Sequence, residues 1–445
     1  MDAIAAGAFW CPDPWAAEPA TARAVFANPS RGSLPFEMLP LFYAFRSRAG
    51  KEFWICIFST YGRPTHVFLP EQDCLIYDYS QHLAPPVLES LLSTIEVARP
   101  ILEHDCNHLP CAAEAIGLLD MQTNFGHQLI NHLSGLQRLV DLGLLDQLDE
   151  IWLCGVEFFG PTETLFPETR GRIRRFRDRW AVSQELLRSP RSRLFKIGSN
   201  VFQARLRERI LRKCPSASAA TGREGALLAV TVRATGRRCV NLPEAVAGIF
   251  ARLSPAFPGL RIVLDGWVFP ESELVAGGSS VATALSPRYL QPIRNEMALA
   301  QAVADALPPG AVAGNVIGLS IRESLAHLAG IDAYLAHVGT LQHKLGFFTD
   351  AGGVVHGPTA QLQTIEGGSF LTEVGRAPLF LPPGAVEDVP VESARGTRFY
   401  DYRIRDLDAV ADRLRDLIAD ALAAHEAERC RNRAVAPPCA TSCVT

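Results

Sequence analysis

The sequence lacks the short motifs that mark three large classes of enzyme. It has no G-x-x-x-x-G-K-[ST] phosphate loop, no G-x-G-x-x-G dinucleotide fingerprint and no G-x-S-x-G nucleophile elbow. Each of these motifs supplies a backbone turn or a side chain that its chemistry requires. The sequence therefore gives no support to P-loop hydrolysis, simple dinucleotide binding or α/β-hydrolase chemistry.

Long apolar runs and a strong excess of charge are also missing. The longest uncharged stretch, residues 306–321, is interrupted by prolines and glycines, whereas a membrane-spanning helix needs about 20 apolar residues. The formal net charge is -4, and no aromatic platform accompanies the arginine-rich run at 170–179, so no nucleic-acid partner is expected. No basic segment precedes an apolar one at the start, so no signal peptide is expected. We expect a cytoplasmic protein without a transmembrane segment; peripheral membrane association and oligomerisation stay open.

Cysteines, in contrast, are numerous. The 11 cysteines are odd in number and irregularly spaced, which favours free thiols over a disulfide framework. Two histidines and two cysteines fall within residues 104–111, and these are residue types that bind zinc. Their interleaved C-x4-C and H-x3-H spacing is uncommon for zinc, and no second ligand pair accompanies them. We therefore expect no metal site.

The length of the chain and the patterns along its sequence together predict a multi-domain α/β protein. At 445 residues the chain exceeds the usual size of one hydrophobic core. Its first part contains short β-rich pieces, such as 53–61 and 65–71, and a small, polar stretch at 215–225 is typical of a linker. The predicted divisions are a β-rich N-terminal portion at 1–100, an α/β domain at 101–218, a Rossmann-like domain at 219–400, an amphipathic helix at 401–432 and a disordered tail at 433–445.

The region after residue 225 alternates between strand and helix patterns. Helical patterns at 243–253, 293–306 and 340–348 separate short apolar runs. Strands separated by helices of this length predict a parallel, doubly wound sheet. The candidate strands are 227–232, 260–265, 315–319, 333–338 and 378–381.

The strongest local feature is an arginine-rich turn after the first of these strands. Arg233, Arg237 and Arg238 follow the strand, and Asn241 precedes a helix. Ligands of open α/β sheets bind outside the carboxyl ends of the strands, and guanidinium groups bind phosphate with paired hydrogen bonds. The turn is therefore either a phosphate site or a solvated loop rich in arginine.

A second anion-compatible turn follows the strand at 333–338. The segment His337-Val338-Gly339-Thr340 leads into a helix that also contains His343, with Thr340 as the expected cap. Gly339 permits close approach of a ligand to the backbone, and the free N–H groups of the helix start attract an anion. The alternative is a helix cap beside a histidine of the core.

A third feature is the helical pattern at 124–142. Asn124 occupies the expected N-cap position, and His127, Asn131, Ser134 and Arg138 recur at helical spacing opposite a leucine stripe. A polar face of this kind either lines a cleft, with His127 as a general base at neutral pH, or faces solvent.

These three segments resemble those of GT-B glycosyltransferases, most closely the family sixty-one group and its bacterial capsule-type relatives. N-F-G-H-Q-L-I-N-H-L (124–133) looks like the N-x-x-H-x-L helix of that group, and T-V-R-A-T-G-R-R-C-V-N (231–241) is similar to its strand-R-x(n)-R-R-x-x-N turn. A-H-V-G-T-L-Q-H-K-L-G-F-F (336–348) looks like its strand-H-G-[AS]-[GA]-L-x-x-x-x-F segment, with Val338 inserted between His337 and Gly339. The likeness covers roughly residues 115–385.

The resemblance implies two Rossmann-like domains that face a cleft, and a sugar transferred from a nucleotide diphosphate to a hydroxyl of a glycan or glycan precursor. It implies no metal or other cofactor. The implied catalytic residues are His127 as base, with Asp120 or Asp105 as substitutes, and Arg233 and Arg238 as diphosphate clamps. Acceptor-side residues would be Asn124 and Asn131. Donor-binding residues would be Arg237, Asn241, Asp265, His337, Gly339, Thr340 and His343.

Two alternatives stay open at this point. Heptosyl or pyruvyl transfer on a related fold would use the same features. The inserted Val338 favours a different class, a non-catalytic nucleotide- or sugar-binding paralogue that acts as a partner subunit.

Overall fold

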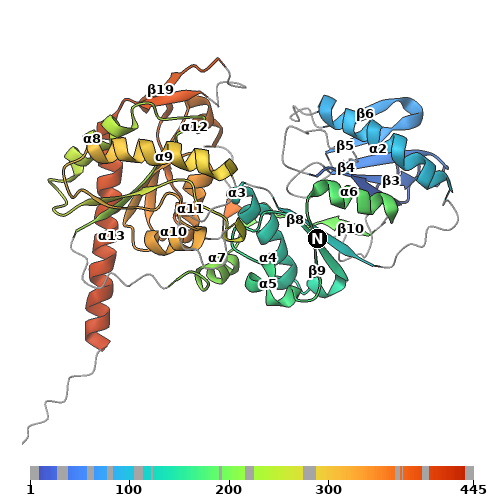
Figure 1. Ribbon diagram of the computed structural model, residues 1–445, viewed down its shortest axis with the longest axis horizontal. Coiled ribbons are helices and arrows are strands. Elements are labelled where there is room, and N and C mark those ends of the chain that lie inside the picture. The colour runs from blue at the N-terminus through green and yellow to red at the C-terminus, as the bar shows by residue number, and fades with distance from the viewer. Residues whose placement is uncertain are drawn as a thin grey trace, which may run out of the picture. The chain divides into compact units, whose positions relative to one another are not determined.

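The computed structural model divides into two compact units (Figure 1). Unit 1 comprises Met1–Arg212, Pro270–Ser272 and Phe370–Glu373, and unit 2 comprises Lys213–Phe269, Glu273–Ser369 and Val374–Thr445. The chain passes into unit 2 after Arg212, and residues 1–100 belong to the same unit as the α/β segment that follows them. The structure describes residues 10–27, 39–57, 65–77, 84–104, 114–121, 124–189, 193–215, 225–273, 287–365, 371–372, 374–392 and 400–435.

An antiparallel sheet forms the first part of unit 1. Its six strands lie in sequence order, so each strand pairs with the next one along the chain. The helix α2 (Ala84–His104) packs on one face, where Leu91 and Ile95 share a core with Phe42 and Trp54. The strands are β1 (Trp10–Cys11), β2 (Ala20–Ala27), β3 (Leu41–Arg46), β4 (Glu52–Ile57), β5 (His66–Leu69) and β6 (Cys74–Tyr77).

A four-stranded parallel sheet forms the second part of unit 1, in the order β10-β7-β8-β9. The free face of the antiparallel sheet packs against it, since Tyr43 and Phe45 share a core with Leu118 and Trp152. The β-rich portion is therefore built into unit 1 by a common core. The remaining elements of unit 1 are β7 (Ile116–Met121), β8 (Glu150–Gly155), α5 (Thr162–Leu165), β9 (Ile173–Phe176), α6 (Arg179–Arg188), β10 (Leu194–Lys196), β11 (Val201–Phe202), α7 (Ala204–Leu211) and β17 (Leu371–Thr372).

The helical pattern at 124–142 forms one continuous helical segment of mixed type. It consists of α3 (Phe125–His127), the π-helical η2 (Gln128–Leu133) and α4 (Ser134–Asp141). Asn124 caps it as predicted, with its side-chain oxygen accepting from the N–H groups of Gly126 and His127. The predicted polar side is divided: Asn131 and Ser134 are buried like the leucine stripe, His127 is half-buried, and Arg138 is exposed.

Gly135 explains how part of the polar side of this segment becomes buried. A Cβ at Gly135 would lie 2.8 Å from the backbone nitrogen of Gly198, so only glycine lets the loop after β10 approach this closely. We expect Gly135→Ala to lower the free energy of unfolding by about 1–3 kcal/mol, the usual cost of overpacking. Urea unfolding measures it, with Gly314→Ala as control because nothing lies within 4 Å of a Cβ there. Equal stability of the two variants would contradict the close approach.

Unit 2 is a doubly wound α/β unit. Its six strands are all parallel, in the order β14-β13-β12-β15-β16-β18. Counted along the chain this is the order 3-2-1-4-5-6, in which the winding direction reverses between β12 and β15. The strands are β12 (Leu227–Thr231), β13 (Arg261–Asp265), β14 (Val312–Asn315), β15 (Ala333–His337), β16 (Gly352–His356) and β18 (Leu379–Phe380), with β19 (Val386–Val389) and β20 (Asp401–Ile404) as a separate antiparallel pair.

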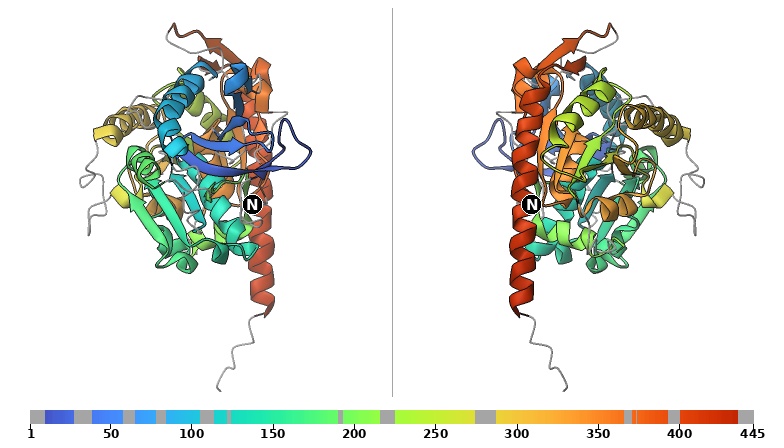
Figure 2. Two further views of the ribbon diagram at one scale, coloured as in Figure 1. Left: turned by 90° about the vertical axis from the view of Figure 1, so that its right-hand side faces the viewer. Right: turned by 90° about the vertical axis from the view of Figure 1, so that its left-hand side faces the viewer.

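Helices cover both faces of this sheet. The residues of α8, α9 and α13 share one core with Leu228 and Val230 of β12, while α10 and α11 share another with Leu227 and Ala229. The long helix α13 runs along the unit (Figure 2) and buries Val410, Leu414 and Ile418. The helices are α8 (Leu242–Leu253), α9 (Pro287–Asp305), α10 (Ile321–Leu328), α11 (Thr340–Phe348), α12 (Thr359–Ile365) and α13 (Leu407–Val435).

The prediction of a strand at 315–319 was wrong. The pairing strand is Val312–Asn315, and Val316 and Ile317 are buried in the turn that follows it, so their apolar character reflects core packing. No helix of the described residues is long and apolar enough to cross a membrane.

Candidate functional site

Buried polar side chains gather at the carboxyl ends of four neighbouring strands of unit 2. Thr231 ends β12, Asp265 ends β13, His337 ends β15 and His356 ends β16. All four are buried, with His356 fully inaccessible to solvent. This edge surrounds the point where the winding reverses, the place where doubly wound sheets bind ligands. We call Thr231, Asp265, His337 and His356 the strand-end cluster.

Arg233 leaves β12 and curls back over the cluster. Its Nε donates to the carbonyl oxygens of Thr235 and Gly236, at 3.1 and 2.7 Å. Burial lowers the pKa of Arg233, while Tyr402 and Glu296 favour its charged form; a guanidinium remains protonated at neutral pH. No described residue forms a hydrogen bond or ion pair with its two terminal nitrogens, so they are available to an anionic ligand.

Arg237 reaches the start of α11. Its Nη1 donates to Gln361 Oε1 at 2.7 Å, and a Cβ placed on Gly339 would lie 3.6 Å from its Nη2. Gly339, with φ of 116°, is the N-cap residue, and Thr340 is the first residue of the helix rather than its cap. A φ in this region strongly favours glycine. A guanidinium therefore lies beside a helix N-terminus, and both attract anions.

Arg238 and Asn241 hold the turn in place. The Arg238 N–H and Nε donate to the two oxygens of Asp401, at 2.7 and 2.8 Å. Asn241 donates to the carbonyl oxygen of Ile404 and accepts from its N–H. Both residues thus tie the arginine turn to β20, and the Arg238 guanidinium already has a carboxylate partner.

His337 and His356 form a buried pair. Their ring centroids lie 4.4 Å apart. Burial lowers the pKa of His337 well below its usual range, and the charges of Arg233 and Arg237 lower it further. Burial also lowers the pKa of His356 to about 3. Both rings are therefore neutral at pH 7.

The partners of the two rings indicate which nitrogen carries the proton. Tyr402 Oη lies 2.7 Å from His356 Nδ1, and burial raises the pKa of the phenol, so the phenol keeps its proton and can donate it to Nδ1. Thr231 Oγ1 accepts the His337 backbone N–H and lies 3.0 Å from its Nδ1, so its own proton is available for Nδ1. When these hydroxyl groups donate to Nδ1, each imidazole carries its proton on Nε2. Neither Nε2 has a hydrogen-bond partner within the described part of the chain, which makes both nitrogens candidates to bind a ligand.

A buried ion pair lies next to these residues. Lys344 of α11 pairs with Asp265 and also donates to the carbonyl oxygen of Gly266 and to Ser324 Oγ. Glu296 of α9 accepts from the N–H of Trp267 at 2.6 Å. Burial raises the pKa of Glu296 to about 8, so this carboxyl is mostly protonated at neutral pH.

The structure thus brings together Arg233, Arg237, His337, Gly339 and Thr340. It places Asp265 in an ion pair beside them and His343 in the core, stacked on Phe347 at 5.0 Å. Sequence reasoning missed His356, Tyr402, Glu296 and Lys344. A usable signal was the repeat of a strand that ends in histidine with glycine and threonine following, A-H-V-G-T at 336–340 and V-H-G-P-T at 355–359.

His127 and Asn131 lie in unit 1. His127 is half-buried, and its Nδ1 lies 3.1 Å from Asn131 Oδ1. Burial lowers the pKa of His127, although the hydrogen bond with Asn131 partly offsets this. The imidazole is therefore neutral at pH 7, as a general base must be.

Asp120 and Asp105 are the two alternative candidates for the general base. Burial alone would raise the pKa of Asp120, but Arg179, Lys196 and the N–H of Leu39 together lower it. An oxygen of Asp120 accepts from Arg179 Nε at 2.5 Å and the other from Leu39 N–H at 2.6 Å, which makes it a structural carboxylate. Asp105 lies outside the described residues, as does the rest of the 104–111 cluster apart from His104, the last residue of α2.

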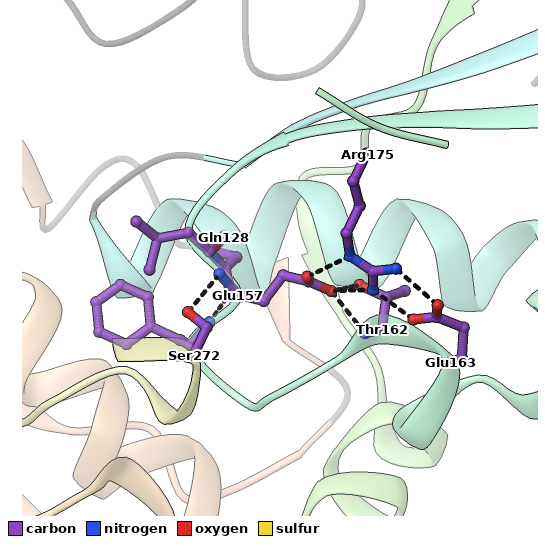
Figure 3. Close-up of polar contacts among 8 residues, drawn as sticks. Gln128, Glu157, Thr162, Glu163, Arg175 and Ser272 are labelled. Atoms are coloured by element: carbon purple, nitrogen blue, oxygen red, sulfur yellow. Dashed lines mark hydrogen bonds and ion pairs between the residues drawn. The ribbon is translucent and has the colours of Figure 1, made fainter. Parts of the chain in front are cut away.

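The arginine-rich run of unit 1 is paired with acidic side chains. Figure 3 shows Arg175 between Glu157 and Glu163, with two hydrogen bonds to each, while Glu157 also accepts from Thr162 and its N–H donates to Ser272. This network joins the end of β8 to β9 and α5. The other pairs are Arg172–Asp146, Arg174–Glu185, Arg177–Asp178 and Arg179–Asp120.

Thiols and metal-ligand groups offer no second centre in the residues that the structure places. The cysteines described there, at positions 11, 56, 74, 154, 214, 239 and 430, form no disulfide with one another. No group of three or more His, Cys, Asp or Glu side chains among the described residues is arranged to hold a metal ion. Protein-family models and curated protein sequences give no match to this chain.

Proposed function

We propose that the protein is a glycosyltransferase that binds a nucleotide-diphosphate sugar at the strand-end cluster of unit 2. The observation that carries the proposal is that the terminal nitrogens of Arg233 and the Nε2 atoms of His337 and His356, at the winding reversal, have no partner among the described residues. A diphosphate is the ligand that matches several N–H donors, two guanidinium groups and a helix N-terminus at one place.

The same groups suit a diphosphate as a leaving group. In the proposed reaction the bond between the anomeric carbon and the diphosphate oxygen breaks, and its electron pair stays on the diphosphate. Arg233, Arg237 and the start of α11 stabilise the negative charge that develops there. Because the two histidines are neutral, they donate hydrogen bonds without adding repulsion between cations. Arg238 and Asn241 keep the arginine turn in position.

The acceptor hydroxyl must lose its proton as it attacks the anomeric carbon. In the proposal His127 is the general base that accepts this proton, because its imidazole is neutral and half-buried. The acceptor is a hydroxyl of a glycan or glycan precursor, with unit 1 as the acceptor side. A GT-B arrangement of the two units belongs to the proposal.

A second candidate function is a non-catalytic subunit that binds the nucleotide sugar. The insertion of Val338 favours it, because it separates His337 from Gly339. An uninterrupted His-Gly pair occurs at His356-Gly357, at the end of the next strand, and this observation favours the enzyme. Heptosyl or pyruvyl transfer would use the same anion site.

A thermal-shift screen of UDP, GDP, ADP and CMP, and of their sugars, tests the proposal. We expect at least one nucleoside diphosphate to raise the melting temperature, since a ligand at about 100 times its Kd stabilises by about 2.7 kcal/mol. The shift should persist in EDTA, because the protein's own arginines neutralise the diphosphate. Slow hydrolysis of the matching donor supports the enzyme; binding without hydrolysis or transfer supports the subunit. Stabilisation by free glycans alone would contradict the donor site.

A further inference from the structure

Asn131 has a fixed amide orientation. Its Nδ2 donates to the carbonyl oxygen of Ser199 at 2.7 Å, and the Ser199 N–H donates to the Asn131 carbonyl at 3.0 Å. A carbonyl oxygen accepts only, so the amide nitrogen must face Ser199 and the amide oxygen must face His127. The side chain is buried, with 1% of its surface exposed.

This orientation determines the tautomer of His127. An amide oxygen only accepts, and it lies 3.1 Å from His127 Nδ1, so Nδ1 must carry the proton. The neutral ring then has its lone pair on Nε2. His337 and His356 differ from it, because their Nδ1 atoms face hydroxyl groups, which can donate as well as accept.

The charged groups nearby act on a different ring. Asp120, Lys196 and Arg179 influence His132, which is buried and whose pKa is lowered by that burial to about 3. The pKa of His127 responds to its own burial and to Asn131, and its neighbour His132 is neutral. Burial therefore keeps His127 neutral at pH 7, while the amide hydrogen bond determines which ring nitrogen carries the proton.

We infer that Asn131 is a positioning residue, which holds His127 as the Nδ1–H tautomer and leaves Nε2 free to accept the acceptor's proton. The chain of Ser199 carbonyl, Asn131 amide and His127 imidazole is a neutral counterpart of a carboxylate that orients a catalytic histidine. This inference rests on the proposed function for its catalytic part. The tautomer itself is a property of the folded protein without substrate.

Long-range 1H–15N spectra of the histidine side chains test the inference in the full chain. The His127 signals are assigned by their loss in His127→Gln. We expect the Nδ1–H pattern in the wild type and a pKa below the ordinary value. Asn131→Leu should give a mixed or Nε2–H pattern, and Asn131→Asp should raise the pKa of His127 because it places a negative charge beside Nδ1.

Turnover gives the second readout. We expect Asn131→Leu to lower kcat about 10- to 100-fold with little change in KM, the usual range for a supporting hydrogen bond. Asn131→Asp should move the acid limb of the kcat/KM profile to higher pH. Gln137→Leu is the matched control, since Gln137 is also buried and bonds Arg209 and Asp141 without touching His127.

The outcomes separate the inference from the proposed function. An Nε2–H pattern in the wild type, or an unchanged pattern in Asn131→Leu, overturns the inference. If Asn131→Leu loses the Nδ1–H pattern but keeps its turnover, the positioning role of Asn131 is overturned. The expected spectra together with no sugar transfer by the wild type confirm the tautomer and contradict the proposed function alone.

Discussion

Replacing Arg233 by glutamine is expected to lower kcat/KM for the sugar donor by at least about 100-fold, the usual effect of removing one preorganised donor at a developing charge. The Arg233 guanidinium is half-buried and anchored through Nε to two carbonyl oxygens. No residue in the described part of the chain pairs with its terminal nitrogens, which lie beside the strand-end cluster. Glutamine keeps a donor but has neither the charge nor the reach of this group.

Two further variants make the result specific. Arg233→Lys keeps the charge and loses the planar fork, so it should recover part of the activity. Arg415→Gln removes an exposed arginine of α13 that pairs with Asp412, and it should leave turnover and donor binding unchanged. Steady-state kinetics and calorimetric titration of the nucleoside diphosphate measure both effects. Near wild-type activity in Arg233→Gln would remove Arg233 from the donor site.

Lys344→Met is expected to lower the free energy of unfolding by about 3–5 kcal/mol, the cost of leaving a buried charge without its partner. Lys344 and Asp265 are both buried, and no other described side chain pairs with the carboxylate of Asp265. Methionine fills a similar volume, so the loss is electrostatic rather than a cavity. The double variant Lys344→Met with Asp265→Asn should recover much of the loss.

The loss should depend on pH in a definite direction. Burial raises the pKa of Asp265 even beside Lys344, and removing Lys344 raises it further. A raised folded pKa favours folding at low pH and loses that contribution as pH rises through it. The defect of Lys344→Met should therefore shrink on acidification. Hydrogen exchange in β13 and β15 measures unit 2 separately; an unchanged exchange rate in the variant would contradict a buried ion pair.

The sequence pattern was sufficient for most of the regular elements of unit 2. Apolar runs separated by helical patterns gave four of its strands, namely those at 227–232, 260–265, 333–338 and 378–381, because local periodicity determines them. The sequence pattern missed β16 because this strand begins with two glycines. Glycine is required at position 353, since a Cβ there would overlap the ring of Tyr334. That requirement comes from packing between strands, which local pattern does not contain. For α10 a signal was present, the capping box of Ser320 and Glu323.

The candidate site was predictable only in part for the same reason. Arg233, Arg237 and the helix start at Thr340 follow predicted strands, and their type alone suggested an anion. His356 and Tyr402 join His337 through the parallel register of β15 with β16 and through β20. Likewise, the burial of Asn131 depends on the loop at Ser199. Such long-range pairings decide which polar groups have partners, and hence which remain available to a ligand.

A crystal structure of the protein with the nucleoside diphosphate that gives the largest thermal shift tests the donor site most directly. We expect the diphosphate at the carboxyl ends of β12 and β15, with its oxygens within hydrogen-bonding distance of the Arg233 guanidinium, of at least one Nε2 of His337 and His356, and of the N–H groups at the start of α11. A diphosphate bound in unit 1, or one held in unit 2 that contacts neither Arg233 nor either of the two histidines, would contradict the proposal.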